Sequence, residues 1–371
     1  AQIYRKGVLA GILTEDDGEY RFCYDGTYLA QEDALPISLT LPLQAEPFVS
    51  PVLFPFFDGL IPEGWLLDVA LRNADVSVLD RMSLLLLCCK ECIGAEYRHE
   101  DLDELAEQVI RAQTTLTGVQ PKLSLNFNKH EGSSRLTIVG LWGDYIFKPQ
   151  TDNYPQLPEN EDLTMHLAEA AKISVPHSLI RLADGRLGYI TKRIDRTTDG
   201  QKIDMEDMCQ LTLRPTEYKY KSSYEKIAKA IMQHCDTPKL ALVNYMQLLL
   251  FCFVTGNNDM HLKNFSLYRP ADSYQLAPAY DLVNVSIANP NDKEELALTL
   301  SGRKNKLKLE HFLHAAATMG LEEKIVLRLI ANMNKALPKW KTLIHSSFLS
   351  EDMKKAYEDT VVKRLERLQE Q

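Results

Sequence analysis

The feature that most constrains the fold of this chain is a change of sequence pattern near residue 205. Before it, alternating apolar and polar residues predict short strands, for example over residues 3–12 and 20–24 on either side of a hairpin turn at 15–18. After it, long apolar or amphipathic stretches predict helices. The predicted helices cover residues 223–235, 238–254, 309–319, 322–337 and 351–371. We therefore predict an α+β chain with a strand-rich first half and a helical second half.

Residues 37–43 alternate in the same way and predict one more strand. A helix predicted over residues 80–92 is mostly apolar, which indicates a buried position, whereas the mixed charges of 351–371 indicate a solvated face. The apolar helix contains Cys88, Cys89 and Cys92. These cysteines are either core residues or metal ligands, and no second Cys or His pair completes a zinc-type ligand set.

The composition is ordinary for a globular protein, with 45% apolar and 25% charged residues. No apolar segment reaches the length of a membrane span, and residues 1–6 lack the apolar core of a signal peptide, so we expect a cytoplasmic protein without a membrane partner. Seven cysteines, an odd number, fit a reducing compartment. The net charge of −9 gives no support to direct, non-specific nucleic-acid binding, because that needs a basic face.

A polar turn at residues 256–264 carries the strongest chemical signal in the chain. Asp259 and Asn264 stand five positions apart, which is the D-x-x-x-x-N spacing of a protein-kinase catalytic loop. In such a loop the Asp accepts the proton of the substrate hydroxyl and the Asn holds a magnesium ion. Asp281, in the later Tyr-Asp-Leu motif, is the candidate for a second metal carboxylate. The spacing alone also occurs in capped turns, so it needs support from other parts of a kinase.

The first half of the chain holds candidates for those parts. Residues 114–122, with several hydroxyls, one glycine and Lys122, form either a loop over phosphates or a surface hairpin. Lys148 ends an apolar strand, where a kinase places its phosphate-binding lysine, but solvated edge lysines occupy the same position. Glu161 opens a helix predicted over 162–171. It either complements the helix dipole or pairs with Lys148.

Together these motifs resemble the HipA-like serine/threonine kinases, the toxin components of bacterial toxin–antitoxin modules. The resemblance extends over nearly the whole chain, with the motifs in the family's order. The segments that carry it are residues 36–43, 56–63, 117–122, 206–210, 256–266 and 280–282. The most specific of them is 256–266.

The resemblance implies a two-lobe, protein-kinase-like fold of the α+β class. Residues 1–95 would form the HipA N-terminal subdomain, a small mixed α/β unit. Residues 96–205 would form the kinase N-lobe with the phosphate loop, and residues 206–371 the mostly helical C-lobe with the catalytic and metal-binding loops. The implied cofactors are ATP and Mg²⁺, and the implied reaction is in-line transfer of the γ-phosphoryl group to a Ser or Thr hydroxyl.

The same resemblance assigns roles to individual residues. Asp259 is the implied catalytic base, and Asn264 and Asp281 are the implied magnesium ligands. The residues implied at the nucleotide are Thr117, Gly118, Val119, Gln120, Pro121, Lys122, Lys148, Lys192, Arg193, Ile194, His261, Leu262, Lys263, Asn264, Tyr280 and Asp281. Family members are regulated by autophosphorylation of a serine in the phosphate loop, where this chain has the hydroxyls of Thr115 and Thr117 instead.

The family's usual partner is a small DNA-binding antitoxin, through which the kinase reaches operator DNA indirectly. Its known protein substrates include aminoacyl-tRNA synthetases, so we expect a kinase that arrests growth. Two alternatives stay open: a phosphotransferase for a small molecule, and an inactive module that binds the antitoxin and co-represses its operon. The joint presence of Lys148, Asp259, Asn264 and Asp281 argues against the inactive module.

Overall fold

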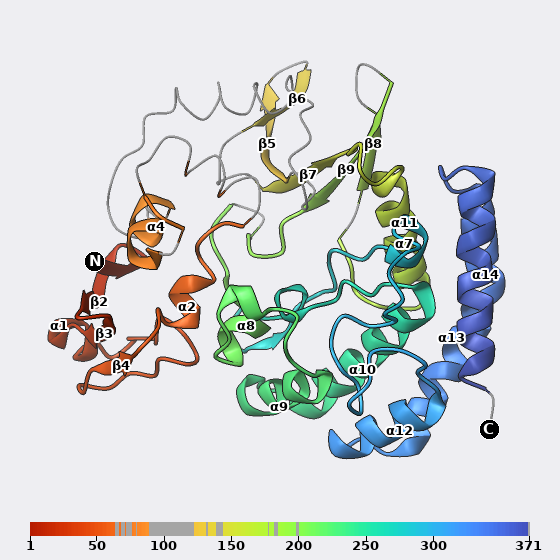
Figure 1. Ribbon diagram of the computed structural model, residues 1–371. Helices are drawn as coiled ribbons and strands as arrows, with labels where there is room; N and C mark the ends of the chain where they lie inside the picture. The colour runs from red at the N-terminus through yellow and green to blue at the C-terminus, as the bar shows by residue number, and fades with distance from the viewer. Residues whose placement is uncertain are drawn as a thin grey trace. The chain divides into compact units, whose positions relative to one another are not determined.

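The computed structural model of the chain describes residues 1–63, 67, 71, 76–78, 80–88, 122–130, 133–138, 144–176, 178–181, 185–197 and 200–369. By packing, the chain forms two compact units (Figure 1). Unit 1 consists of residues 1–101 and 206–219, and unit 2 consists of residues 102–205 and 220–371. Residues 206–219 therefore group with the N-terminal segment, although the whole strand-rich part of unit 2 precedes them in sequence.

Unit 1 contains a four-stranded antiparallel sheet in the order β1-β2-β3-β4, with short helices. Its elements are β1 (Gln2–Arg5), β2 (Val8–Asp16), β3 (Glu19–Tyr24), α1 (Gly26–Leu29), β4 (Phe48–Ser50), α2 (Pro55–Asp58), α4 (Arg81–Cys88), α8 (Met208–Leu211) and a 3₁₀ turn at Thr216–Tyr218. Leu13, Phe22, Phe57 and Leu84 lie in its buried core. The predicted burial of the apolar helix is confirmed for Leu84 and Leu85. Of the three cysteines, Cys89 and Cys92 lie outside the described residues, and only the backbone of Cys88 is described.

Two tight turns shape this sheet. The strand predicted over residues 3–12 is in fact a hairpin, because Lys6 and Gly7 adopt φ values of 49° and 82° and form a two-residue turn between β1 and β2. Asp17 and Gly18 form the second turn, with φ values of 47° and 77°, where the sequence predicted it. Positive φ at both central residues matches the twist of the flanking strands, which explains why glycine occupies the second place in each turn.

Residues 37–43 do not form the predicted strand. Ser38 and Leu41 are instead paired across a tight turn, and the Ser38 hydroxyl accepts the backbone N–H of Thr40 at 3.1 Å. The Ser38 hydroxyl also donates to Glu206 Oε2 at 2.6 Å, and the Leu39 N–H donates to Glu206 Oε1 at 2.8 Å. The turn thus serves as a binding site for one buried carboxylate, a role that alternation of residue types does not reveal.

Unit 2 combines a five-stranded antiparallel sheet, in the order β6-β5-β7-β9-β8, with a group of helices. The sheet part contains β5 (Leu123–His130), β6 (Ser133–Ile138), β7 (Tyr145–Pro149), α7 (Leu157–Ala170), β8 (Ser178–Arg181) and β9 (Leu187–Lys192). β10 (Asp204–Asp207) lies where the chain passes from unit 2 to unit 1. The helical part contains α9 (Tyr224–His234), α10 (Pro238–Thr255), a 3₁₀ turn at Leu262–Asn264, β11 (Ser266–Arg269), β12 (Gln275–Leu276), α11 (Val285–Ala288), α12 (Leu309–Thr318), α13 (Glu323–Ser346) and α14 (Glu351–Arg367).

Helix α10 is the core helix of the helical part. At 18 residues with a mean hydropathy of 1.4, it is long and apolar enough to cross a membrane, so the expectation that no segment reaches this length is wrong. Its residues 248–255 are all buried inside the protein, among them Phe251 and Phe253. Figure 1 shows α10 among α9, α13 and α14, and α10 packs on each of these helices. Most of the apolar surface of α10 is therefore covered by protein, although Leu240 near its start is exposed.

The last two helices correct two sequence predictions. α13 does not end at Leu337 but continues through Pro338 to Ser346. Trp340, beyond the proline, is fully buried and donates from Nε1 to the Leu167 carbonyl at 3.0 Å, which offsets the cost of about 3 kcal/mol for a proline inside a helix. α14 is not simply a solvated face, because Tyr357 is buried and Arg364 donates to the Phe253 carbonyl at 2.6 Å.

Candidate active site

The sheet of unit 2 places Lys148 in the protein interior. Its strand, β7, has β5 on one side and β9 on the other, so Lys148 does not lie on a sheet edge. Lys148 stands opposite Tyr189 of β9, and its ammonium lies 5.5 Å from the centroid of the Tyr189 ring. Only 3% of Lys148 is exposed. A solvated strand-end lysine is therefore excluded, and so large a burial of an ammonium requires charged partners.

Helix α7 supplies the first partner. The helix begins at Leu157, five residues before the predicted start, with Pro158 in its first turn. Glu161 consequently lies beyond the N-terminal turn, where complementing the helix dipole would matter most. Its carboxylate is buried and contacts the Lys148 Nζ at 2.5 Å. Glu161 therefore forms the ion pair with Lys148, which was one of the two interpretations, rather than complementing the helix dipole.

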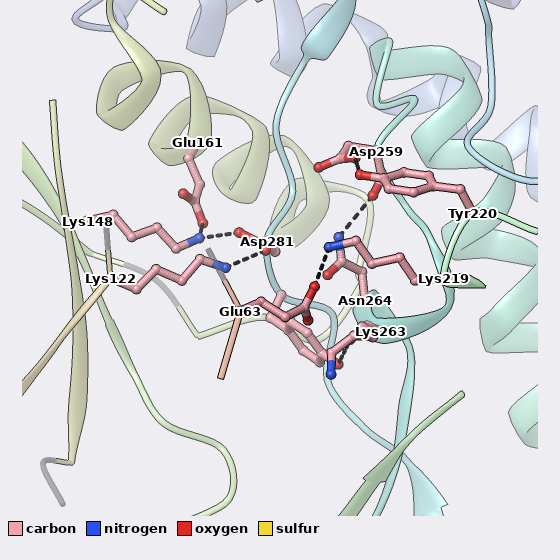
Figure 2. A network of polar contacts seen from close by, with 11 residues as sticks. Glu63, Lys122, Lys148, Glu161, Lys219, Tyr220, Asp259, Lys263, Asn264 and Asp281 are labelled. Carbon is pink, nitrogen blue, oxygen red and sulfur yellow. Dashed lines mark hydrogen bonds and ion pairs between the residues drawn. The ribbon is translucent and has the colours of Figure 1, made fainter. Parts of the chain in front are cut away.

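Asp281 supplies the second partner, from the loop after β12. The Lys148 ammonium also contacts Asp281 Oδ1, and Lys122 contacts Asp281 Oδ2 at 2.8 Å. Figure 2 shows Lys148 between Glu161 and Asp281, with Lys122 reaching the same aspartate. Asp281 has a φ of 61°, a conformation that costs a non-glycine residue about 1 kcal/mol and persists only where the surroundings hold it. The two lysines are part of those surroundings.

The charges of this group follow from burial and from its ion pairs. Burial by itself raises the pKa of Asp281, but the charges of Lys122 and Lys148 outweigh it and hold that pKa well below its usual range. Burial opposes the charge of Lys148, whereas attraction to Asp281 and Glu161 raises its pKa above that of an ordinary lysine. Burial raises the pKa of Glu161 to about 7, against the attraction of Lys148. At neutral pH, Asp281 is thus an anion, Lys148 is a cation, and Glu161 is the group that titrates.

The polar turn of the sequence forms a compact loop after α10. Gly256 ends α10 with a φ of 77°, and the Asp259 N–H donates to Asn257 Oδ1 at 3.2 Å. Asn264 Nδ2 donates to the Asp259 carbonyl at 3.0 Å, so the D-x-x-x-x-N pair is tied together by a hydrogen bond. The Tyr220 hydroxyl donates to Asp259 Oδ1 at 2.6 Å, and Asp259 keeps part of its surface exposed. A half-exposed carboxylate held in this way can accept a proton from a bound hydroxyl.

Asn264 and Asp281 offer an amide oxygen and a carboxylate as metal ligands. Mg²⁺ prefers such hard oxygen ligands, and in phosphoryl-transfer sites it takes one or two from the protein and the rest from phosphates and water. The pair of cations on Asp281 shows that this carboxylate already accommodates positive charge. Within the described part of the chain there is no group of three or more His, Cys, Asp or Glu side chains that could hold a metal ion. The residues present fit a magnesium ion that arrives with a nucleotide rather than a cage made by protein alone.

Comparison with known proteins gives the family. The model of the HipA-like C-terminal domain matches residues 114–340, and the model of the HipA N-terminal domain matches residues 1–96. The chain belongs to the HipA-like family. The N-terminal model thus matches before the C-terminal model along the chain.

Relatives of this HipA-like chain carry kinase names. A protein of Sinorhizobium fredii named "Putative kinase Y4dM" is 30% identical over 348 residues, which cover 84% of this chain and 83% of the relative. The "Serine/threonine-protein kinase toxin HipA" of Shewanella oneidensis is 23% identical over 337 residues, covering 79% and 76%. The solved complex of Shewanella oneidensis HipA, HipB and operator DNA contains a chain that matches with a TM-score of 0.76 at 20% identity, covering 99% of this chain and 97% of that one. The predicted α+β, two-lobe HipA fold is confirmed.

Besides Lys122, Lys148 and Asp281, the residues expected around the nucleotide of this HipA-like chain fall into three groups. His261, Leu262 and Asn264 are buried, and the Tyr280 hydroxyl donates to the Lys263 carbonyl at 3.0 Å, so this group forms one packed region. In the second group, Lys192 is exposed, Ile194 is half-buried, and Arg193 makes two hydrogen bonds of 2.7 and 2.8 Å to Asp195. The third group, Thr117, Gly118, Val119, Gln120 and Pro121 together with Thr115, lies outside the described residues.

Three residues at the site carried no signal in the sequence. Tyr220 contacts both Asp259 and His261, with the Tyr220 and His261 rings edge to face at 4.8 Å. Tyr189 lies under Lys148, and Asn160 precedes Glu161 on α7. Each comes from an element that is distant from the catalytic loop in sequence. Only the packing of unit 2 brings them to the site.

Proposed function

We propose that this HipA-like chain is an ATP-dependent serine/threonine protein kinase that acts as the toxin of a toxin–antitoxin module. The observation that carries the proposal is the ion-pair group in which the half-buried Asp281 and the buried Glu161 both contact the buried Lys148. A protein kinase needs both a lysine–glutamate pair and a metal-binding aspartate in place before transfer. Here the two acidic partners lie 13 and 133 positions from the lysine, so the fold, and not adjacency in the sequence, brings the three charges together.

In the proposed reaction, Lys148 binds the phosphates of ATP and Glu161 keeps the ammonium in position. Asn264 and Asp281 hold Mg²⁺, which when bound neutralises charge on the phosphates. Asp259 accepts the proton of the acceptor hydroxyl, and Tyr220 orients its carboxylate through the 2.6 Å hydrogen bond. Because hydrogen bonds and ion pairs hold these groups in place, catalysis would come mainly from positioning and from charge stabilisation.

The proposed regulation is autophosphorylation of Thr115 or Thr117 in the phosphate loop. A phosphate adds close to two negative charges at neutral pH. A few residues before Lys122 in the sequence, such charges would draw this lysine away from Asp281 and compete with ATP phosphates for the same cations. Incubation with Mg-ATP should therefore add phosphate to one of these threonines and lower activity. Mass spectrometry that finds neither threonine modified would contradict this regulation.

The proposed partners are a protein substrate, such as an aminoacyl-tRNA synthetase, and a small DNA-binding antitoxin. The likeness to the HipA chain of the HipA, HipB and operator DNA complex supports an antitoxin that provides the DNA contact. The net charge of −9 agrees with DNA binding through a partner rather than by this chain directly. Such a kinase would act in the cytoplasm, where its substrate and the operator are.

The test compares the wild type with Asp259→Asn and with the control Asp272→Asn, which changes an exposed carboxylate of unit 2. Each protein is expressed in bacteria to score growth, and each purified protein is incubated with cell extract and γ-labelled Mg-ATP. We expect growth arrest and a labelled protein band for the wild type and the control, and a loss of at least about a hundredfold in labelling rate for Asp259→Asn.

The other outcomes decide against the proposal. Label that appears in small molecules rather than in protein would identify a small-molecule phosphotransferase. Equal behaviour of the wild type and Asp259→Asn would indicate an inactive module whose function is to bind the antitoxin. A labelled band whose phosphate is on tyrosine would overturn the serine/threonine assignment.

A further inference from the structure

Asn160, the residue before Glu161 on α7, is polar but fully buried. Its Nδ2 donates to the carbonyl of Asn284 at 3.0 Å, and its Oδ1 accepts the backbone N–H of the same residue at 2.8 Å. One side chain thus binds both main-chain polar groups of a residue 124 positions away. Buried backbone groups must be paired, so this amide fixes the position of the chain at Asn284 much as a neighbouring strand would.

Asn284 is tied to both loops of the site. It follows Asp281 by three residues, and its side-chain Oδ1 accepts the Ser286 hydroxyl at 2.8 Å and the Ile287 N–H at 3.2 Å, which caps α11. The Ser286 N–H donates to the carbonyl of Gly256 at 3.1 Å, at the start of the loop that carries Asp259. Any shift of Asn284 is therefore transmitted to both loops.

These contacts close a ring around Asp281. On one side Lys148 joins Glu161 to Asp281, and on the other side Asn160, from the same helix, joins α7 to Asn284. Asp281 needs such support because its backbone has a positive φ, which a non-glycine residue keeps only when its neighbours enforce it. Figure 2 shows the Lys148 half of this ring, with Asp281 and Asn264 as separate contributions from two loops.

We propose that Asn160 is a positioning residue for the two magnesium ligands. Acting through the backbone of Asn284, it fixes Asp281 relative to the loop that holds Asn264, so that both oxygens can bind one ion together with the nucleotide. The inference rests on the proposed kinase function. It adds a residue that does not contact the metal ligands but fixes their backbone through its hydrogen bonds to Asn284, which caps α11.

The test uses Asn160→Ala with Gln247→Ala as its matched control. Each change removes a side-chain amide that donates to a backbone carbonyl in unit 2, since Gln247 Nε2 bonds to the Ala171 carbonyl at 2.7 Å. Calorimetry measures the affinity for adenylyl imidodiphosphate with and without Mg²⁺. We expect the gain in affinity from Mg²⁺ to fall by at least about tenfold in Asn160→Ala, as for other residues that orient metal ligands, and to stay within about twofold in Gln247→Ala.

A purely structural role predicts another result. Both variants would then lose thermal stability, and the gain from Mg²⁺ would match the wild type in each folded variant, which overturns the inference. If Asn160→Ala does not fold, Ser286→Ala decides in its place, because it removes only one donor to Asn284 Oδ1. Ser286→Ala should reduce the gain from Mg²⁺ in the same direction by a smaller factor, and an unchanged gain overturns the inference.

The failure of the inference is distinct from the failure of the proposed function. A wild type whose nucleotide affinity does not increase with Mg²⁺ overturns both. A wild type that gains affinity from Mg²⁺ and transfers phosphate to protein, together with an Asn160→Ala variant that behaves identically, overturns the positioning role alone.

Discussion

Replacement of Gly256 by alanine tests how tightly the loop that carries Asp259 is packed. Gly256 has a φ of 77°, and a Cβ placed on it lies 2.5 Å from Asn284 Oδ1 and closer still to the Ser286 hydroxyl. The left-handed backbone costs an alanine about 1 kcal/mol. Overpacking adds about 1–3 kcal/mol, and displacement of Asn284 breaks hydrogen bonds worth about 1 kcal/mol each. We therefore expect Gly256→Ala to lower the free energy of unfolding by about 3–5 kcal/mol.

Gly320→Ala is the matched control, because Gly320 has a nearly identical φ of 78° but no atom within 4 Å of the added Cβ. It should cost only the backbone part, about 1 kcal/mol. Urea unfolding followed by circular dichroism gives both values from the transition midpoints, provided the slopes agree. Equal losses in the two variants would refute the close packing of Asn284 and Ser286 on the loop. The kinase rate should also fall in Gly256→Ala and stay unchanged in Gly320→Ala, since only the first change displaces the loop that carries Asp259.

Two further measurements test the charges in each unit. The folded-state pKa of Glu161, about 7, lies above its ordinary value of 4.5, so its contribution to stability is fully present below pH 4.5 and is lost as the pH rises toward 7. The free energy of unfolding of the wild type, minus that of Glu161→Gln, should fall by up to about 1.4 kcal/mol per pH unit across that window in urea titrations; a difference that grows with pH would contradict this. In unit 1, the buried Asp58 accepts Arg81 Nε at 2.8 Å and the Thr216 N–H at 2.7 Å. Asp58→Asn leaves Arg81 without its anion and should destabilise unit 1 by about 3 kcal/mol. Limited proteolysis across a urea series measures this loss. A variant that resists the protease as well as the wild type does would show that the ion pair contributes little to stability.

The site illustrates which inferences local sequence supports. The spacing of Asp259 and Asn264 can be recognised in the sequence because both lie in one continuous segment, where residues keep fixed offsets, and the structure joins them by a hydrogen bond. The sequence did not predict whether the Lys148 side chain is buried, because a lysine at a strand end is exposed or buried according to the order of strands in the sheet. Tyr220 and Asn160 gave no local signal, since each acts on a partner from a distant segment.

The sequence by itself determined that strands precede helices and where most helices lie, because periodicity and turn residues such as Asp17 and Gly18 act over a few positions. It did not determine that α13 continues through Pro338, where the burial of Trp340 outweighs a local cost. Only the tertiary structure decided which charges meet, because the pairing of Lys148 with Glu161 and Asp281 depends on burial and on segments brought together by packing. Ionic interactions gain strength when water is excluded, and the exclusion of water is a property of the folded chain.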